Sequence, residues 1–223
     1  MNNQWKGKKW YCYGTSMTDN VSLINGGVHC GNYSKYLAEY AGLEEHNFGK
    51  GGSGIMPQKH GIEDSVKGRC MRLSDGKEEA DLITVEVIPN DMSFELGEVT
   101  DTSDETFCGN LNQIIEYLLT NTKAVVVILI ASRSRWHYAD YSIKYPPTCD
   151  NTKKWLEWED AVNTVCRMHG IQCFNGASEA GLGYFRVNKD NSLVQDQIHL
   201  TEEGGKVLAK YYWGRLKNLY PND

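Results

Sequence analysis

The sequence lacks any apolar run of the length, about 20 residues, that a helix needs to cross a bilayer. The apolar run at 125–131 is far too short and has the character of a buried strand. The first six residues are mostly polar, and no apolar signal core follows them. We therefore expect a cytoplasmic protein without membrane insertion; a secreted form that lacks its signal peptide would have the same sequence pattern.

The sequence also lacks metal-binding and nucleic-acid-binding patterns. Its seven cysteines are odd in number and scattered, with no Cys-x-x-Cys pair, and its histidines have no zinc-like spacing. This usage indicates reduced thiols and no bound metal. The formal net charge is −6 and no long basic run occurs. That balance argues against a nucleic-acid partner.

No internal repeat, low-complexity tract or Pro/Ser-rich linker divides the chain. A length of 223 residues suits one α/β unit, which buries roughly 70% of its unfolded surface on folding. We expect a single domain, 1–223.

Apolar strand patterns alternate with helical spacing along the chain. Strands are expected at 9–13, in a run ending at 47, and at 81–87, 125–131 and 171–174, and helices at 33–41, 111–119, 155–169 and 201–219. Such alternation, with nearly all-apolar strands, predicts a parallel sheet covered by helices on both faces. In an open parallel sheet, chemistry gathers beyond the carboxyl ends of the strands. Residues 14–18, 49–54 and Asn90 follow the first three expected strands, where this architecture would place a site.

A serine and a histidine at opposite ends of the chain could perform acyl transfer together. A serine hydroxyl is a weak nucleophile at neutral pH, so an imidazole must take its proton and a third group must fix the imidazole tautomer. Ser16 lies in the turn after the first strand, and Asp196 stands three residues before His199. The sequence thus offers a nucleophile, an orienter and a base.

Each block also has a purely structural interpretation. Ser16 could sit in an ordinary strand-to-helix turn with a capping hydroxyl. The glycines at 51–54 could form a turn with positive φ or a phosphate cradle, although the Lys-Ser/Thr ending of a P-loop is missing. Asn90 could form a turn or cap, and Asp196 and His199 could be a cap and a polar contact. The order and context of the four blocks favour the catalytic interpretation.

Taken together, the blocks around Ser16, Gly52, Asn90 and His199 resemble the SGNH or GDSL hydrolase superfamily, and the match spans 14–199. The resemblance implies a flavodoxin-like fold, a three-layer α/β/α sandwich with a mainly parallel five-stranded sheet. It implies a catalytic triad of Ser16, Asp196 and His199. It also implies an oxyanion hole formed by the backbone N–H groups of Ser16 and Gly52 and by the side-chain amide of Asn90.

Two positions depart from the pattern of this family. Thr15 replaces the aspartate of Gly-Asp-Ser, so we expect altered hydrogen bonding in the loop with the chemistry retained. Ile88 replaces the glycine of Gly-x-Asn-Asp. Isoleucine is excluded from the φ values open to glycine, and the following Pro89 favours an extended conformation at Ile88.

The stretch 132–152 is expected to be irregular and is rich in aromatic residues. A loop of this length in a compact domain is usually functional or disordered, and its aromatic residues favour a function. Trp136, His137 and Tyr138 are candidate substrate contacts, because aromatic faces can stack on a sugar ring. The alternative is that these aromatic side chains cover a core edge or a subunit contact.

The resemblance implies a serine esterase that needs no cofactor and cleaves short-chain, chiefly acetyl, oxygen esters. Similar single-domain members act on carbohydrates, so a glycan or small-molecule ester is the expected substrate. A lipid or acyl-thioester hydrolase is the alternative enzyme, and a non-catalytic glycan-binding relative is the alternative of another class. The sequence is also compatible with assembly into a homo-oligomer.

Overall fold

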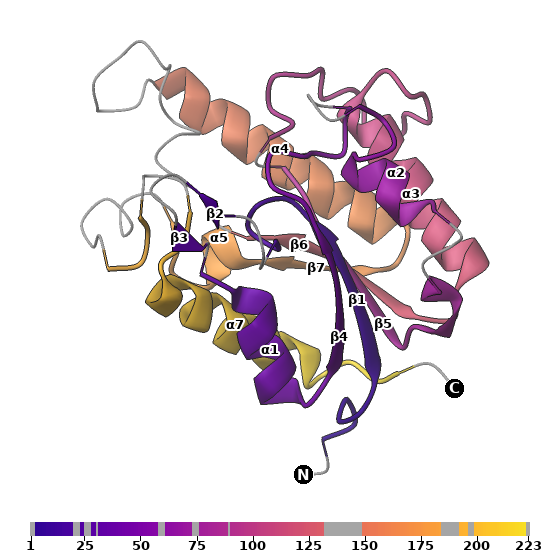
Figure 1. Cartoon of the computed structure of the whole chain (residues 1–223). Helices are drawn as coiled ribbons and strands as arrows, with labels where there is room; N and C mark the ends of the chain where they lie inside the picture. Colours follow the sequence, from indigo (N-terminus) through magenta and orange to yellow (C-terminus); the bar gives the residue numbers. More distant parts are fainter. Residues whose placement is uncertain are drawn as a thin grey trace.

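A five-stranded parallel sheet forms the centre of the protein (Figure 1). The computed structural model describes residues 3–19, 23–24, 28–29, 31–57, 61–72, 76–88, 90–131, 149–183, 192–195 and 199–221. Across the sheet the strands run in the order β4 (Glu44–Gly49), β1 (Lys9–Gly14), β5 (Leu82–Glu86), β6 (Val125–Ile130) and β7 (Gln172–Asn175). All four neighbouring pairs are parallel, which confirms the predicted sheet.

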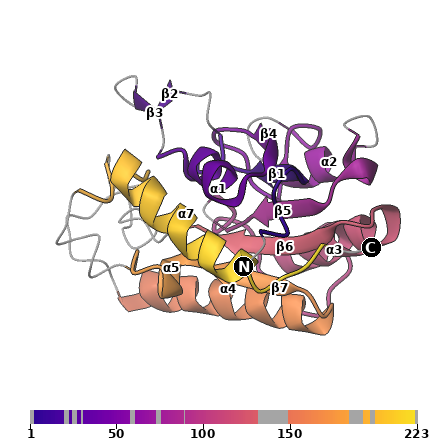
Figure 2. The same ribbon diagram turned by 90° about the horizontal axis from the view of Figure 1, so that it is seen from below.

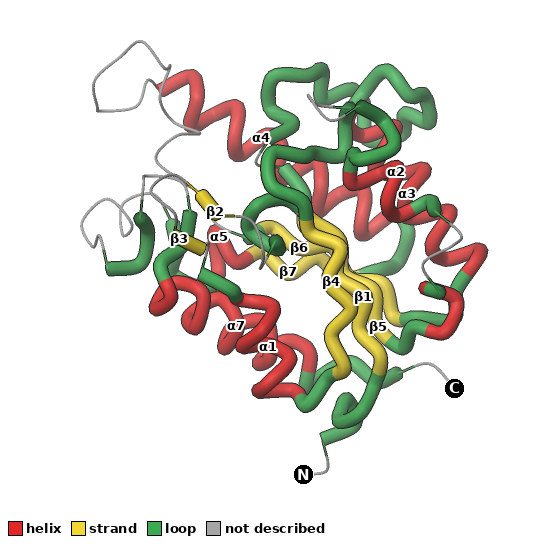
Figure 3. The backbone as a smooth tube through the Cα atoms, viewed as in Figure 1, coloured by secondary structure: helices red, strands yellow, loops and turns green. Residues whose placement is uncertain are grey.

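The strand order is the flavodoxin-like one that the resemblance implied. Counted along the chain, the strands of the sheet lie in the order 2-1-3-4-5, so the direction of winding reverses between β1 and β5. Ligands of open α/β sheets bind outside the carboxyl ends of the strands at such a reversal. Figure 3 shows the loops that follow β1 and β4 at the same end of the sheet.

Helices cover both faces of the sheet, giving three layers. Helices α1 (Tyr33–Ala41) and α7 (Glu202–Leu216) pack side by side on one face (Figures 1 and 2). The other face is covered by α2 (Val66–Cys70), α3 (Phe107–Asn121) and α4 (Cys149–Met168). Two separate clusters of buried apolar side chains fill the spaces between the layers. Short elements complete the described fold: the antiparallel pair β2 (Leu23–Ile24) and β3 (Val28–His29), the 3₁₀ helix η2 (Lys77–Glu79) and α5 (Gly176–Glu179).

Some element boundaries differ from the sequence-based expectation. Helix α4 begins at Cys149, so the end of the predicted irregular stretch 132–152 is helical. Its first turn is polar and lacks the apolar spacing by which helices are recognised. That turn contains no proline or glycine, so a helix can begin there after Pro147. Helix α7 starts as expected, with Thr201 as its N-cap accepting a 3.1 Å hydrogen bond from the N–H of Gly204.

In the described part of the chain, no helix combines the length and the apolar character required to cross a membrane. Cys12, Cys70, Cys108 and Cys166 are buried free thiols, and Cys173 is a half-buried one.

The close contact of α7 with the segment preceding α1 depends on a glycine. A Cβ atom built on Gly205 would lie 1.6 Å from the carbonyl oxygen of Gly31, and the N–H of Gly31 donates to the carbonyl of Leu200 at 3.0 Å. The backbone of α7 therefore approaches the opposite chain directly, just after His199. A side chain at position 205 would push the two segments apart.

We predict that Gly205→Ala destabilises the fold, although alanine is the better helix former by about 1 kcal/mol. Gly214→Ala is the matched control, because it lies in the same helix and a Cβ there meets no atom within 4 Å. Urea unfolding should give a lower unfolding free energy for Gly205→Ala and an unchanged or higher one for Gly214→Ala. Equal stabilisation by both substitutions would contradict the packing described here.

Candidate active site

Ser16 and His199, 183 residues apart in sequence, form a hydrogen bond: Nε2 of His199 lies 2.9 Å from Oγ of Ser16. Ser16 follows β1, and His199 lies two residues before the N-cap of α7. Both side chains are half-buried, so each is accessible from one side. If Nε2 accepts the serine proton, Nδ1 carries the other ring proton and faces away from Ser16. The arrangement suits proton transfer between a serine hydroxyl and an imidazole.

The turn that carries Ser16 is fixed by its own backbone. The carbonyl oxygen of Thr15 accepts hydrogen bonds from the N–H groups of Thr18 at 3.1 Å and Asp19 at 3.0 Å. Thr15, Met17 and Thr18 are buried, whereas Ser16 is partly exposed. The turn thus presents the serine and buries its neighbours.

The segment 49–54 at the end of β4, called the glycine block below, is joined to this turn. The Asp19 carboxylate accepts a 2.9 Å hydrogen bond from the N–H of Gly51, and the Asn47 amide donates to the carbonyl of Thr18 at 2.8 Å. A Cβ atom on Gly49 would lie 2.4 Å from the N–H nitrogen of Asp19, so only glycine allows this approach. Gly52 has φ +72°, a value that favours glycine. These contacts hold Gly52 in the loop beside the serine turn.

Asn90 and Asp91 tie the end of β5 to the same glycine block. The Asn90 amide donates to the carbonyl of Ser53 at 2.7 Å. The buried Asp91 carboxylate accepts from the N–H groups of Ile55 at 3.1 Å and Met56 at 2.9 Å. The side chain of Asn90 therefore reaches the residue next to Gly52.

Ile88 does not have the extended conformation that the sequence predicted. Its φ is +88°, in the region that glycine favours, although its side chain is fully buried. A β-branched residue in this conformation is a strained outlier, at a cost on the order of 1–3 kcal/mol. The turn around it is held by a 2.8 Å hydrogen bond from the N–H of Asp91 to the carbonyl of Ile88. Burial of the side chain and the contacts of Asp91 offset the local preference, so the turn keeps the backbone that glycine would give.

Thr15, at the position where the SGNH pattern has an aspartate, contacts a buried carboxylate from strand β5. Glu86, at the end of β5, accepts hydrogen bonds from the N–H of Thr15 at 2.7 Å and from its hydroxyl at 2.9 Å. The Thr18 hydroxyl also donates to Glu86, at 3.2 Å. An aspartate at position 15 would place a second carboxylate against Glu86, which like-charge repulsion disfavours. The hydrogen bonds between Thr15 and Glu86 are therefore the altered loop hydrogen bonding that was expected from the presence of threonine at position 15.

Complete burial raises the pKa of Glu86 from its ordinary 4.5 to about 7. Hydrogen bonds from Thr15 and Thr18 and the positive charge of Arg69 act in the opposite direction. Burial also raises the pKa of the nearby Tyr33 hydroxyl well above its usual value, and the negative charge of Glu86 adds to that shift. Glu86 is therefore a buried ionisable group that contacts the turn carrying Ser16.

Several sequence-predicted residues lie outside the described part of the chain. They are Asp196, Trp136, His137, Tyr138 and Pro89. The structure brings together Ser16 and His199, and it brings Asn90 to the glycine block that contains Gly52. The expected orienter Asp196 and the expected substrate contacts remain predictions.

The sequence analysis missed two residues of the site, Arg69 and Glu86, and it assigned no role in the site to Asp91. Glu86 had a readable signal, because it is a carboxylate inside the largely apolar run at 82–88, and a buried charge requires partners. Arg69 had none, since it belongs to a five-residue helix that the pattern did not predict. Among the described residues, no group of three His, Cys, Asp or Glu side chains could hold a metal ion.

Comparisons with known proteins find similarity in structure and none in sequence. No family model matches the chain, and no curated protein sequence matches it. A protein from Lactobacillus plantarum superposes with a TM-score of 0.75 at 23% identity, covering 96% of this chain and 99% of its own. A variant of the acetyl xylan esterase Axe2 from Geobacillus stearothermophilus gives 0.65 at 14% identity, with 100% of both chains covered.

A third solved structure, a GDSL-like lipase by its assigned name, comes from Bacteroides ovatus. It gives a TM-score of 0.62 at 13% identity and covers 96% of this chain and 100% of its own. These similarities, together with the strand order, show that the chain has the α/β three-layer fold of the SGNH or GDSL hydrolases.

We predict that Glu86 makes the stability of the protein depend on pH. A raised pKa means that the folded state binds a proton more tightly than the unfolded state between pH 4.5 and about 7. The stabilisation is full below this window and is lost as the pH rises through it, by about 3 kcal/mol in total. Urea unfolding of the wild type and Glu86→Gln should therefore be measured at several pH values. The unfolding free energy of the wild type, relative to that of Glu86→Gln, should decline as the pH rises across this window. A difference independent of pH would contradict the raised pKa.

Proposed function

We propose that the protein is a serine esterase that cleaves short-chain acyl oxygen esters, chiefly acetyl esters, through an acyl-serine intermediate. One observation carries the proposal: the hydrogen bond of 2.9 Å between Oγ of Ser16 and Nε2 of His199, at the carboxyl edge of a sheet with the SGNH hydrolase fold. A hydroxyl that donates to a neutral imidazole is the arrangement required for nucleophilic attack at neutral pH. The whole chain, 1–223, acts as one catalytic domain.

In the proposed reaction, Ser16 attacks the ester carbonyl while His199 takes the hydroxyl proton. Asp196 orients His199 from the side of Nδ1. Collapse of the tetrahedral intermediate expels the alcohol, which receives the proton from His199, and leaves the acyl group on Ser16. A water molecule, deprotonated by His199, then attacks the acyl-serine; the bond between the acyl carbon and Oγ of Ser16 breaks, His199 returns the proton to Oγ, and the acid is released.

The negative oxygen of each tetrahedral intermediate would be bound by three donors: the N–H groups of Ser16 and Gly52 and the amide of Asn90. The contact of Asn90 with the carbonyl of Ser53, and the contact of the Gly51 N–H with Asp19, support a shared location of these donors. Donors fixed before the reaction stabilise developing charge without reorganisation, which is the main source of rate in such sites. No cofactor takes part in this mechanism.

The substrate class is the finer part of the proposal. We favour an acetylated carbohydrate, because the fold is shared with an acetyl xylan esterase and because the stretch 132–152 is rich in aromatic residues. Trp136, His137 and Tyr138 would contact the sugar. A lipid or acyl-thioester substrate would require an extended apolar groove, and a glycan-binding protein without activity would not require the Ser16 and His199 contact.

We predict that the wild type hydrolyses p-nitrophenyl acetate much faster than p-nitrophenyl octanoate, and that Ser16→Ala abolishes turnover of both. The control is Ser103→Ala, which removes an exposed hydroxyl in the loop before α3 and should keep wild-type turnover. Octanoate turnover as fast as acetate turnover would favour a lipid or thioester substrate. Absence of any turnover dependent on Ser16 would favour the glycan-binding alternative.

We predict that Asn90→Ala lowers kcat by roughly 10²- to 10³-fold, because one donor to the oxyanion is lost. The change in KM should be small, since the donor acts on the transition state. Asn163→Ala, on the outer helix α4, is the matched control, because its amide bonds only the carbonyl of Glu159 among the contacts described for it. An Asn90→Ala enzyme with wild-type kcat would remove Asn90 from the oxyanion hole.

A further inference from the structure

One peptide group, the one between Gly14 and Thr15, is held at both ends by buried ionisable side chains. Its carbonyl oxygen accepts a 2.6 Å hydrogen bond from Nη2 of Arg69. Its N–H donates a 2.7 Å hydrogen bond to Oε2 of Glu86. This peptide group joins the last residue of β1 to Thr15, the residue before Ser16. Its orientation therefore sets the direction of the serine turn.

The two side chains come from separate elements on opposite sides of this peptide group. Arg69 lies in α2 and is 6% exposed, and Glu86 ends β5 and is fully buried. Burying a charge costs several kcal/mol unless hydrogen bonds compensate for the lost water. Hydrogen bonds to charged groups are also shorter and stronger than neutral ones. Such an arrangement fixes a backbone group more firmly than neutral partners would.

Gly14 makes this arrangement possible. A Cβ atom at position 14 would lie 2.6 Å from Oε2 of Glu86 and 2.2 Å from Oγ1 of Thr18. A side chain there would displace the carboxylate from the N–H of Thr15. The glycine at the start of the serine motif is therefore explained by the approach of Glu86.

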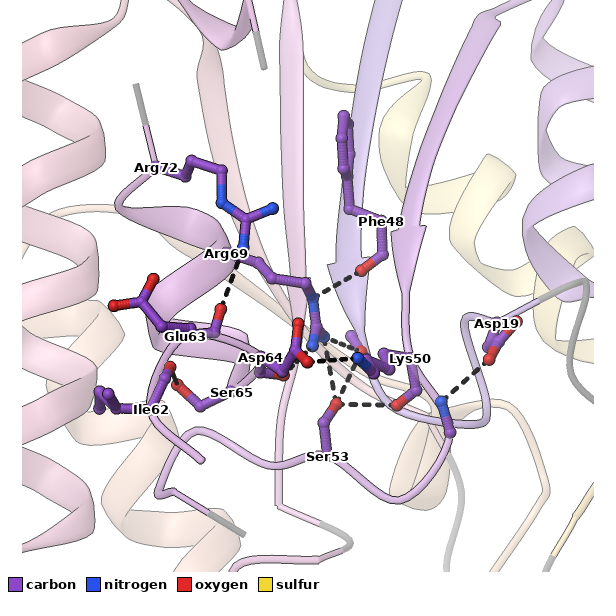
Figure 4. Close-up of polar contacts among 12 residues, drawn as sticks. Asp19, Phe48, Lys50, Ser53, Ile62, Glu63, Asp64, Ser65, Arg69 and Arg72 are labelled. Carbon is purple, nitrogen blue, oxygen red and sulfur yellow. Dashed lines mark hydrogen bonds and ion pairs between the residues drawn. The ribbon is translucent and has the colours of Figure 1, made fainter. Parts of the chain in front are cut away.

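Arg69 also connects the serine turn with the glycine block (Figure 4). Its Nε donates to the carbonyl of Phe48, at the end of β4, at 2.9 Å, and its Nη2 donates to the hydroxyl of Ser53 at 3.1 Å. The Ser53 hydroxyl donates in turn to the carbonyl of Lys50 at 2.8 Å. One guanidinium thus spans the loops that carry two of the proposed oxyanion donors.

We propose that Arg69 and Glu86 are positioning residues, which clamp the Gly14–Thr15 peptide group and thereby fix Ser16 relative to the glycine block. Neither side chain touches the substrate in this proposal; both act through the backbone of the turn. The predicted effect on turnover rests on the esterase function proposed above. The effect on the backbone is independent of that function.

The test compares Arg69→Met and Glu86→Met with the wild type in p-nitrophenyl acetate hydrolysis. Misplacing the nucleophile by a fraction of an ångström should lower kcat by about 10- to 100-fold and leave KM within about threefold. Because both side chains hold the same peptide group, the double variant should lose much less than the product of the two single losses.

Lys67→Met is the matched control. Lys67 is a second buried cation of α2, and it donates to Asp104 at 2.7 Å and to Asn110 at 2.8 Å, away from the serine turn. Its loss should reduce stability but keep kcat within about threefold of the wild type. If Lys67→Met lowers kcat as much as Arg69→Met, the role of Arg69 is general packing and the proposal is wrong.

Conservative variants guard against failure to fold. Glu86→Gln keeps one acceptor for the N–H of Thr15, so its kcat should lie between those of the wild type and Glu86→Met. Arg69→Lys keeps the charge but loses the fork that reaches Phe48 and Gly14 together, so it should be intermediate as well. Wild-type kcat in both conservative variants and in both methionine variants would overturn the proposal.

Hydrogen exchange of the Thr15 amide, followed by NMR, tests the clamp without turnover. The amide should be protected in the wild type and in Lys67→Met, and it should exchange at least about tenfold faster in Glu86→Met, beyond any change in core amides. Should the wild type lack activity dependent on Ser16, the esterase proposal fails and this exchange measurement alone decides the clamp. Unchanged Thr15 protection in Glu86→Met would overturn it.

Discussion

The parallel pairing of β1 with both β4 and β5 is the constraint on which the site depends. Gly14 lies opposite Gly49 in the first pair, and Tyr13 lies opposite Val85 in the second. All three strands therefore end at the same level, and the loops that follow them start side by side. The serine turn, the glycine block and Asn90 meet for this reason, although the chain separates them by more than 70 residues from first to last.

Polar side chains then hold these loops in place where regular structure ends. Loops buried at the edge of a sheet leave backbone groups without ladder partners, and such groups must find others. Asp19 accepts from a backbone N–H group of the glycine block, Asp91 accepts from that of Ile55 just after the block, and Arg69 donates to the backbone carbonyls of Phe48 and Gly14. The same side chains that satisfy the backbone also fix the geometry of the site. Stability and preorganisation are therefore linked at this edge.

Strain is concentrated at one position of the site. Ile88 keeps a positive φ although the sequence argues for an extended backbone there. The local preference was read correctly, but it was outweighed by full burial of the side chain and by the turn that Asp91 closes. Thr15 is the opposite case, because its replacement of an acid suits the carboxylate of Glu86 beside it. Departures from a family pattern can thus be either strained or compensated, and only the neighbours distinguish the two.

The sequence by itself determined the parallel α/β architecture, most of the elements and the positions of Ser16, Gly52 and Asn90 after strand ends. Apolar periodicity and turn residues are local signals, so the elements could be read directly from them. The contact of Ser16 with His199, the φ of Ile88 and the roles of Arg69 and Glu86 were decided by tertiary structure alone. These features arise between residues distant in sequence, where burial and the demand for hydrogen-bond partners outweigh local preference.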